Sequence, residues 1–210
     1  MCAKSNKPKL LVELIPTTCH YSNVRTMVSK KEWDTLRNQC YEKANHVCEI
    51  CGNNGLKQGF KHKVECHEIW EYDDVNHVQT LKGLISLCPI CHQVKHIGRA
   101  IAIGKQTQCF IQLARVNKWN QQEITKHILE SFELHKERSK HEWTLDISLL
   151  TKAPYNLKID LKAERIFETK VYKKKPKKKT TNGKKKIHPK AKIAAVLKQT
   201  KPKTKRPPKK

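Results

Sequence analysis

The last forty residues of the chain contain no Asp or Glu. Between Val171 and Lys210 there are seventeen Lys and one Arg, so this segment carries +18 of the formal net charge of +25. Residues 1–170 are only mildly basic, with 26 Lys and Arg against 19 Asp and Glu. Like charges in one block oppose folding, and such arms commonly bind polyanions. We predict that residues 171–210 form a disordered, Lys-rich tail. Its candidate polyanion contacts are Lys173, Lys174, Lys175, Lys177, Lys178, Lys179, Lys184, Lys185 and Lys186.

Long apolar runs are also missing. No stretch approaches the ~20 apolar residues of a membrane-spanning helix, and the first residues lack the apolar core of a signal peptide. The nine cysteines are odd in number and include two C-x-x-C pairs, which favours metal-bound thiolates over a disulfide framework. We therefore expect an intracellular protein that is neither secreted nor bound to a membrane. The run Lys173–Lys179 resembles a nuclear-import signal, so the nucleus or a viral factory is the expected location if the host is eukaryotic.

The rest of the pattern divides the chain into segments. Residues 1–8 are predicted to be flexible, 9–150 to form one domain with its motif core at 46–103, and 151–170 to be an extension. Periodicity and capping signals predict an α+β fold with helices around a small hairpin. The expected strands cover 10–15, 64–70, 78–87 and 143–149, and the expected helices cover 30–44, 89–103, 107–117 and 120–140. We expect the first and last strands to pair, which would bring the ends of the domain together.

Four of the cysteines have the spacing of zinc ligands. Cys48 and Cys51 form one pair in a tight turn, and Cys88 and Cys91 form the other at a predicted helix start. Each pair can supply half of a tetrahedral four-thiolate site, and a helix N-terminus and a zinc ion both favour thiolate over thiol. We predict a structural Zn²⁺ held by all four cysteines. The alternative is two unrelated pairs that are buried or redox-active.

Histidines lie beside both parts of this cysteine pattern. His67 lies in a predicted strand, where alternation places it on the opposite face from Cys66 and Glu68. His92 and His96 are four residues apart and so share one face of the following helix. A strand histidine opposed by two helix histidines can hold a divalent ion. Ordinary surface or core histidines are the alternative.

The motif as a whole carries a family resemblance. Its parts are Cys48-x-x-Cys51, the segment CHEIW at 66–70 and the segment LISLCPICHQVKH at 84–96. Together they resemble the zinc-containing HNH endonucleases of the ββα-metal type. Segments at 21–25, 33–34 and 141–148 are similar to a phage and bacterial branch of that family. The resemblance thus spans about residues 9–150 and excludes the tail. It implies a small ββα-metal core with a four-cysteine zinc site, flanked by helices.

The resemblance also implies a role for each matching residue. His67 matches the general base that takes a proton from the attacking water, and His92 matches a ligand of the catalytic divalent ion. His96 matches a further helix histidine that binds metal in the colicin-type branch. Cys66 stands where the family usually has Asp or His as another ligand, and a thiolate favours a softer metal over Mg²⁺. Gly83 stands where the family usually has Asn, which helps to orient the base.

These two departures leave more than one function open. The leading hypothesis is a metal-dependent DNA endonuclease with structural Zn²⁺ and a catalytic Mg²⁺ or softer transition-metal ion. The alternative is a catalytically decayed, zinc-stabilised DNA-binding protein, which Cys66 and Gly83 favour. If Cys66 is a spectator, Glu68 or water fills its place. A third hypothesis, a Lys-rich DNA-condensing protein, rests on the tail alone. The tail beside such a domain indicates a virus or other mobile element, and the oligomeric state is left open.

Overall fold

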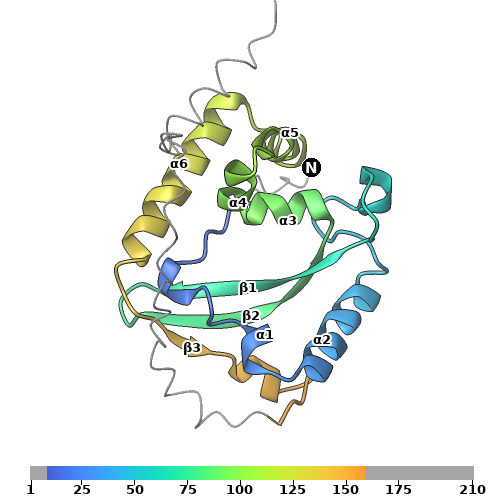
Figure 1. Ribbon diagram of the computed structural model, residues 1–210, viewed down its shortest axis with the longest axis vertical. Helices are drawn as coiled ribbons and strands as arrows, with labels where there is room; N and C mark the ends of the chain where they lie inside the picture. The colour runs from blue at the N-terminus through green and yellow to red at the C-terminus, as the bar shows by residue number, and fades with distance from the viewer. Residues whose placement is uncertain (1–8, 159–210) are drawn as a thin grey trace, which may run out of the picture. The chain divides into compact units, whose positions relative to one another are not determined.

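The structure, a computed structural model, describes residues 9–158, which form a mixed α+β arrangement (Figure 1). The predicted tail and its candidate lysines, residues 1–8 and residues 159–170 lie outside the described residues. Three strands form one sheet in the order β1-β2-β3. They are β1 (Glu65–Asp73), β2 (Val78–Leu87) and β3 (Thr144–Asp146). The α-helices are α1 (Val24–Met27), α2 (Lys30–Lys43), α3 (Pro89–Lys95), α4 (Ile97–Ala102), α5 (Gln106–Asn117) and α6 (Gln121–Arg138).

The antiparallel hairpin of β1 and β2 is the centre of this arrangement, as the sequence predicts. Glu65 pairs with Leu87 at one end, and the register shifts between Ile69 and Trp70. At the tip, the Asp73 side chain accepts hydrogen bonds from the backbone N–H groups of Val75 and Asn76, two of the four residues of the turn. Because side chains alternate along a strand, neighbouring residues of β1 face opposite layers of helices.

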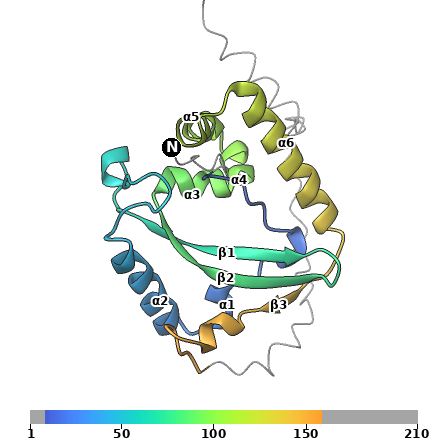
Figure 2. The ribbon, with the colours of Figure 1, turned by 180° about the vertical axis from the view of Figure 1, so that it is seen from behind.

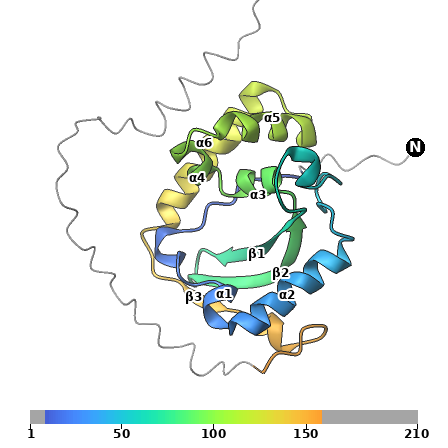
Figure 3. The ribbon, with the colours of Figure 1, turned by 45° about the vertical axis from the view of Figure 1, so that its right-hand side comes forward.

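Helices cover the hairpin from two sides. Figures 1 and 3 show α3, α4 and α5 on one side and α1 and α2 on the other, and Figure 2 shows the same order from behind. On the α1–α2 side, buried residues of both helices, β2 and the C-terminal turn form one apolar cluster. Its fully buried members are Val24, Leu36, Leu81, Ile147 and Leu150. Trp70 packs against this cluster, as does Leu157, so the core extends past residue 150.

Capping residues set the starts of the two longest helices where the sequence predicts them. Ser29 accepts a hydrogen bond from the Glu32 N–H while the Glu32 carboxylate accepts one from the Ser29 N–H. Asn120 and Glu123 make the same reciprocal pair at the start of α6. Such a capping box satisfies backbone N–H groups that have no partner within the helix. These two predictions are confirmed.

The prediction that the first and last strands pair is wrong. β3 runs parallel to β2, with Val78 opposite Thr144, and residues 10–15 form no strand. Side chains of the following helices take the hydrogen bonds that a strand partner would provide. The Leu10 N–H donates to the Asn117 side chain at 3.0 Å, and the Val12 N–H donates to His127 Nε2 at 2.9 Å. Leu10 and Val12 are nevertheless buried, which explains why this segment is apolar.

The single helix expected over residues 89–103 is two helices. α3 ends and α4 begins at His96, whose φ of −104° and ψ of 43° are not helical. The His96 N–H still donates to the His92 carbonyl at 3.2 Å. The break therefore leaves the two histidines one turn apart, on the side of α3 that faces β1.

A substitution at Gly55 tests how tightly the loop before β1 is packed. A Cβ at this position would lie 2.1 Å from the His62 carbonyl oxygen and 3.0 Å from Pro89 Cδ. We expect Gly55→Ala to displace this backbone and to lower the thermal unfolding midpoint, at a cost of about 1–3 kcal/mol. Gly98→Ala is the control, because its Cβ would meet only Leu14 at 3.6 Å and alanine favours the α4 helix. Equal midpoints for both variants would contradict the packing.

Candidate metal centres

The four predicted cysteines converge at the junction of the hairpin and α3. The ligand atoms of Cys48, Cys51, Cys88 and Cys91 all lie within 4.8 Å of one another, and the Cys51 and Cys88 sulfurs are 3.6 Å apart. In a tetrahedral site with Zn–S bonds of about 2.3 Å, neighbouring sulfurs are about 3.8 Å apart. The donor set and its spacing therefore fit a zinc ion. Cys51 is partly exposed and the other three are buried.

Each cysteine pair is shaped by its own backbone. In the first, the Gly52 N–H donates to the Cys48 carbonyl at 2.8 Å, and Gly52 takes the left-handed φ of +68° that favours glycine. In the second, Cys88 is the N-cap of α3, with Pro89 in the first turn. Proline is suited to this position because its missing N–H would have no helical partner. Both turns were expected from the sequence.

Two glutamine side chains donate to the sulfurs. Gln58 Nε2 lies 3.2 Å from Cys88 Sγ, and Gln112 Nε2 lies 3.0 Å from Cys91 Sγ. Amide donors stabilise the negative charge of a thiolate and orient it. The sequence analysis missed both residues. Gln112 lies on α5, 21 residues beyond Cys91, and nothing in its local sequence distinguishes it from a surface glutamine.

The sulfurs strongly affect one another's ionisation. Hydrogen bonds from Cys51 and the other thiols hold the pKa of Cys48 far below its usual value, whereas hydrogen bonds to Cys48 raise the pKa of Cys91. Four thiolates this close repel each other, so they cannot all be charged together without a cation between them. A divalent ion would remove this repulsion.

We expect zinc bound at the four-cysteine group to stabilise the fold. Cys88→Ser should lower the bound zinc by about one equivalent and lower the thermal unfolding midpoint, because ligand binding and folding are coupled at such sites. Cys109→Ser is the matched control, since Cys109 is equally buried but lies outside the group. Zinc content by elemental analysis and thermal melts with and without a chelator provide the measurement. A Cys88→Ser variant that retains all its zinc would contradict this prediction.

The structure brings together His67 of β1 with His92 and His96 of the helical segment. Their ring centroids are 5.3 Å apart for His67 and His92, 5.1 Å for His67 and His96, and 4.8 Å for His92 and His96. One nitrogen of each ring lies within 4.8 Å of the other two. We call these three residues the histidine triad. Three imidazoles at this spacing can hold a transition-metal ion.

Glu65 connects the triad to the loop before β1. One of its carboxylate oxygens contacts His92 Nδ1, and the other lies 2.8 Å from His62 Nε2. Burial alone would raise the pKa of Glu65, but the hydrogen bonds and charges of His92 and His62 together outweigh it and the pKa is lowered. A charged Glu65 therefore accepts from His92 Nδ1 and leaves Nε2 for a metal. Glu65 is two residues before His67, so strand alternation was a usable signal that the sequence analysis did not apply.

Glu13 makes the corresponding contact to His67 from the N-terminal segment. Its carboxylate lies 3.2 Å from His67 Nε2 and also contacts the buried Lys95 ammonium. The hydrogen bond to His67 and the charge of Lys95 outweigh burial and lower the pKa of Glu13. No sequence signal identifies this contact, because Glu13 is 54 residues from His67.

Burial favours the neutral form of two of the triad rings, those of His67 and His96. It lowers the pKa of His67 and lowers that of His96 to about 3. A neutral imidazole is the form that binds a metal or accepts a proton. The site is therefore compatible with either role near neutral pH.

Cys66 does not join the triad, which corrects its expected place among the ligands of the catalytic metal. It faces α2, where its N–H donates to the Tyr41 hydroxyl at 3.3 Å and where the nearby Cys40 thiol raises the pKa of Cys66. Glu68 is on the same face of β1, beside the start of α1, where burial raises its pKa to about 7. The physical reason is strand alternation, because residue 66 points away from the side that residue 67 faces.

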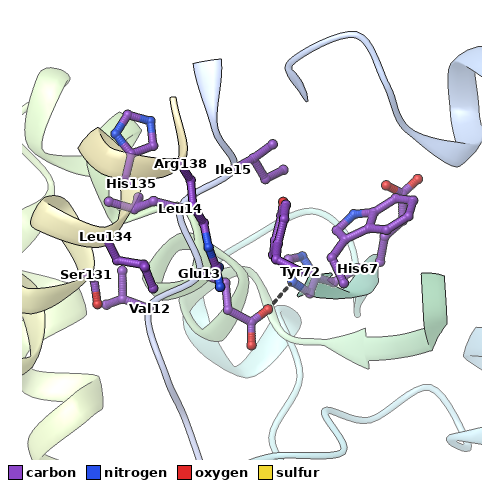
Figure 4. Close-up of a pocket in the computed structure, with 12 residues that line it drawn as sticks. Val12, Glu13, Leu14, Ile15, His67, Tyr72, Ser131, Leu134, His135 and Arg138 are labelled. Atoms are coloured by element: carbon purple, nitrogen blue, oxygen red, sulfur yellow. Dashed lines mark hydrogen bonds and ion pairs between the residues drawn. The ribbon is translucent and has the colours of Figure 1, made fainter. Parts of the chain in front are cut away.

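A cavity of about 190 Å³ adjoins the triad at His67 (Figure 4). It lies between the segment 12–15, β1 and α6. Glu13 lies beside His67 in its wall (Figure 4). The other polar residues that line it are Glu68 and Tyr72 of β1 and Ser131, His135 and Arg138 of α6. His92 and His96 do not line it. The imidazole of His67 therefore has the helix histidines on one side and this cavity near the other.

Comparison of the chain with protein-family models, with curated proteins and with solved structures finds no match. Within residues 9–158, no helix has the length and apolar character needed to cross a membrane. Among residues 9–158, the two groups of metal-ligating side chains are features from which function can be inferred.

Removing the carboxylate beside His92 should weaken metal binding at the triad. We expect Glu65→Gln to lower the affinity for a second divalent ion, titrated into protein already loaded with one zinc, by about 10- to 100-fold. The reason is that Glu65 orients the His92 ring and makes its other nitrogen a stronger metal ligand. Glu71→Gln is the control on the same strand, because Glu71 pairs with the exposed Lys82 and lies outside the triad. Isothermal titration calorimetry measures the difference, and equal affinities would contradict the role of Glu65.

Proposed function

We propose that the protein is a metal-dependent DNA endonuclease that hydrolyses phosphodiester bonds. The observation that carries this proposal is the histidine triad, in which one strand histidine and two helix histidines lie within ligand distance of each other. The triad lies on a hairpin followed directly by a helix, next to the four-cysteine group. This combination is what the resemblance to HNH endonucleases implies. Because the comparisons find no match, the proposal rests mainly on the chemistry of the triad and the residues around it.

His67 is the proposed general base. Its ring is buried and neutral, and Glu13 holds Nε2. Such a ring can accept a proton from a water molecule that attacks phosphorus, and Glu13 stabilises the imidazolium that then forms. Lys95 holds Glu13 in place from the other side. The base is thus oriented by contacts that do not involve the substrate.

His92 and His96 are the proposed ligands of a divalent ion. When bound, the ion would polarise the scissile phosphate and stabilise the oxygen that leaves. Imidazole donors suit zinc and other transition metals better than Mg²⁺, which prefers oxygen ligands. We therefore favour a transition metal at this site, on the basis of its imidazole donors and not of the Cys66 thiolate.

DNA is the proposed partner because DNA is a polyanion and the chain is strongly basic. The lysines of the tail are proposed to bind phosphates without sequence preference, and such binding weakens steeply as salt rises. The main alternative is a zinc-stabilised DNA-binding protein without activity. The position of Cys66 favours this alternative. Cys66 is turned away from the triad and so does not fill the metal-ligand position that the resemblance implies for it.

A plasmid-nicking assay tests the assignment of the base. We expect His67→Ala to reduce metal-dependent cleavage by about 10²- to 10⁴-fold, the usual contribution of a general base. His92→Ala should also abolish most cleavage, because it removes a metal ligand. His20→Ala is the control, since His20 is exposed and lies outside the triad. Both active-site variants should keep about one zinc, as a single four-thiolate site would hold.

The outcomes distinguish the roles. Full cleavage by His67→Ala would exclude it as the base. Loss of the second metal in His67→Ala would make His67 a third ligand instead. Wild-type protein that binds DNA but never cleaves it, with any divalent ion, would support the decayed DNA-binding alternative.

A further inference from the structure

The cavity beside His67 has walls suited to a flat, mostly apolar group. Its sides are Val12 and Leu14 of the N-terminal segment, Trp70 and Tyr72 of β1, and Leu134 of α6. Figure 4 shows the Tyr72 ring between Ile15 and His67. Aromatic rings favour stacking with other flat rings. An apolar cavity of roughly 150 Å³ accepts one benzene molecule, so about 190 Å³ has room for a single six-membered ring with substituents.

The polar groups of the cavity indicate a neutral occupant with a hydrogen-bond acceptor. The Tyr72 hydroxyl is buried and has no hydrogen-bond partner among residues 9–158, and a buried polar group of this kind calls for a partner. Arg138 is already paired, since two of its nitrogens donate to the Asp74 carboxylate at 2.7 Å and its guanidinium lies 4.5 Å from the centre of the Tyr72 ring. The carboxyl groups of Glu13 and Glu68 also line the cavity and disfavour an anion. A phosphate is therefore a poor fit.

We propose that this cavity receives one unpaired nucleobase of the DNA strand that is cut. The inference rests on the proposed nuclease function, because Glu13 and His67 line the same cavity and so place its occupant beside the scissile phosphate. A nucleobase has two π faces for the aromatic wall, and its carbonyl oxygens or ring nitrogens can accept a hydrogen bond from the Tyr72 hydroxyl. Base stacking on aromatic side chains recurs in proteins that bind single strands.

This assignment specifies the substrate class. A base within a duplex is paired and stacked, and moving it into a pocket costs free energy that an unpaired base does not require. We therefore expect the protein to prefer DNA with a bulged or single-stranded nucleotide at the cut site over fully paired DNA. The preference should be roughly 5- to 100-fold, as stacking of one base typically contributes.

The test compares two tryptophan variants of the full-length protein. Leu134→Trp fills the cavity from α6, whereas Ile111→Trp adds the same ring to an exposed apolar position on α5 that does not line it. Tyr72→Phe removes only the unpartnered hydroxyl and keeps the ring, so it tests the cavity with little effect on folding. Each variant is tested on hairpin DNA with a bulged nucleotide and on fully paired hairpin DNA. The first measured quantity is the ratio of the two cleavage rates, and the second is the ratio of the two binding affinities without added divalent ion.

We expect both ratios to favour bulged DNA in wild type and Ile111→Trp, to approach one in Leu134→Trp and to fall several-fold in Tyr72→Phe. Ratios near one in wild type, or unchanged in both cavity variants, would overturn the inference. If wild type cleaves no DNA yet binds bulged DNA preferentially, and the cavity variants lose that preference, the nuclease proposal fails while the nucleobase site stands.

Discussion

The candidate site depends on how the start of α3 is held against the hairpin. Four cysteine sulfurs gather at this junction, and Ser86 at the end of β2 ties the first cysteine turn to the sheet. Its N–H donates to the Glu49 carboxylate at 2.7 Å, and its hydroxyl donates to the Val47 carbonyl at 3.1 Å. Because α3 begins at this point, its orientation determines where the helix histidines lie. A change in the cysteine group would therefore displace the triad without touching it.

Two carboxylates orient the rings of two of the three triad histidines. Glu65 reaches His92 from the strand that carries His67, and Glu13 reaches His67 from the N-terminal segment. Each leaves one imidazole nitrogen free on the opposite side of the ring, which is the arrangement typical of metal-binding and proton-accepting histidines. The segment that contains Glu13 also forms a wall of the adjoining cavity. The same short stretch thus shapes both the proposed base and the proposed nucleobase site.

The elements that sequence reasoning predicted correctly are those specified by neighbouring residues. The capping boxes at Ser29 and Asn120 and the alternation along β1 and β2 act over a few residues. The errors concern longer distances. Residues 10–15 are apolar except for Glu13 and were predicted as a strand, but Asn117 and His127 satisfy backbone N–H groups of this segment from helices more than a hundred residues away. The helix break at His96 was likewise missed.

The sequence by itself determined which ligands are present and which of them are close in pairs, since covalent spacing keeps Cys48 with Cys51 and His92 with His96. Only the tertiary structure decided which of these pairs meet. It placed His67 opposite the helix histidines, turned Cys66 toward α2, and added Glu13 and Gln112 to the two centres. The physical reason is that contacts between residues tens of positions apart depend on how helices and strands pack, and local sequence does not encode that packing.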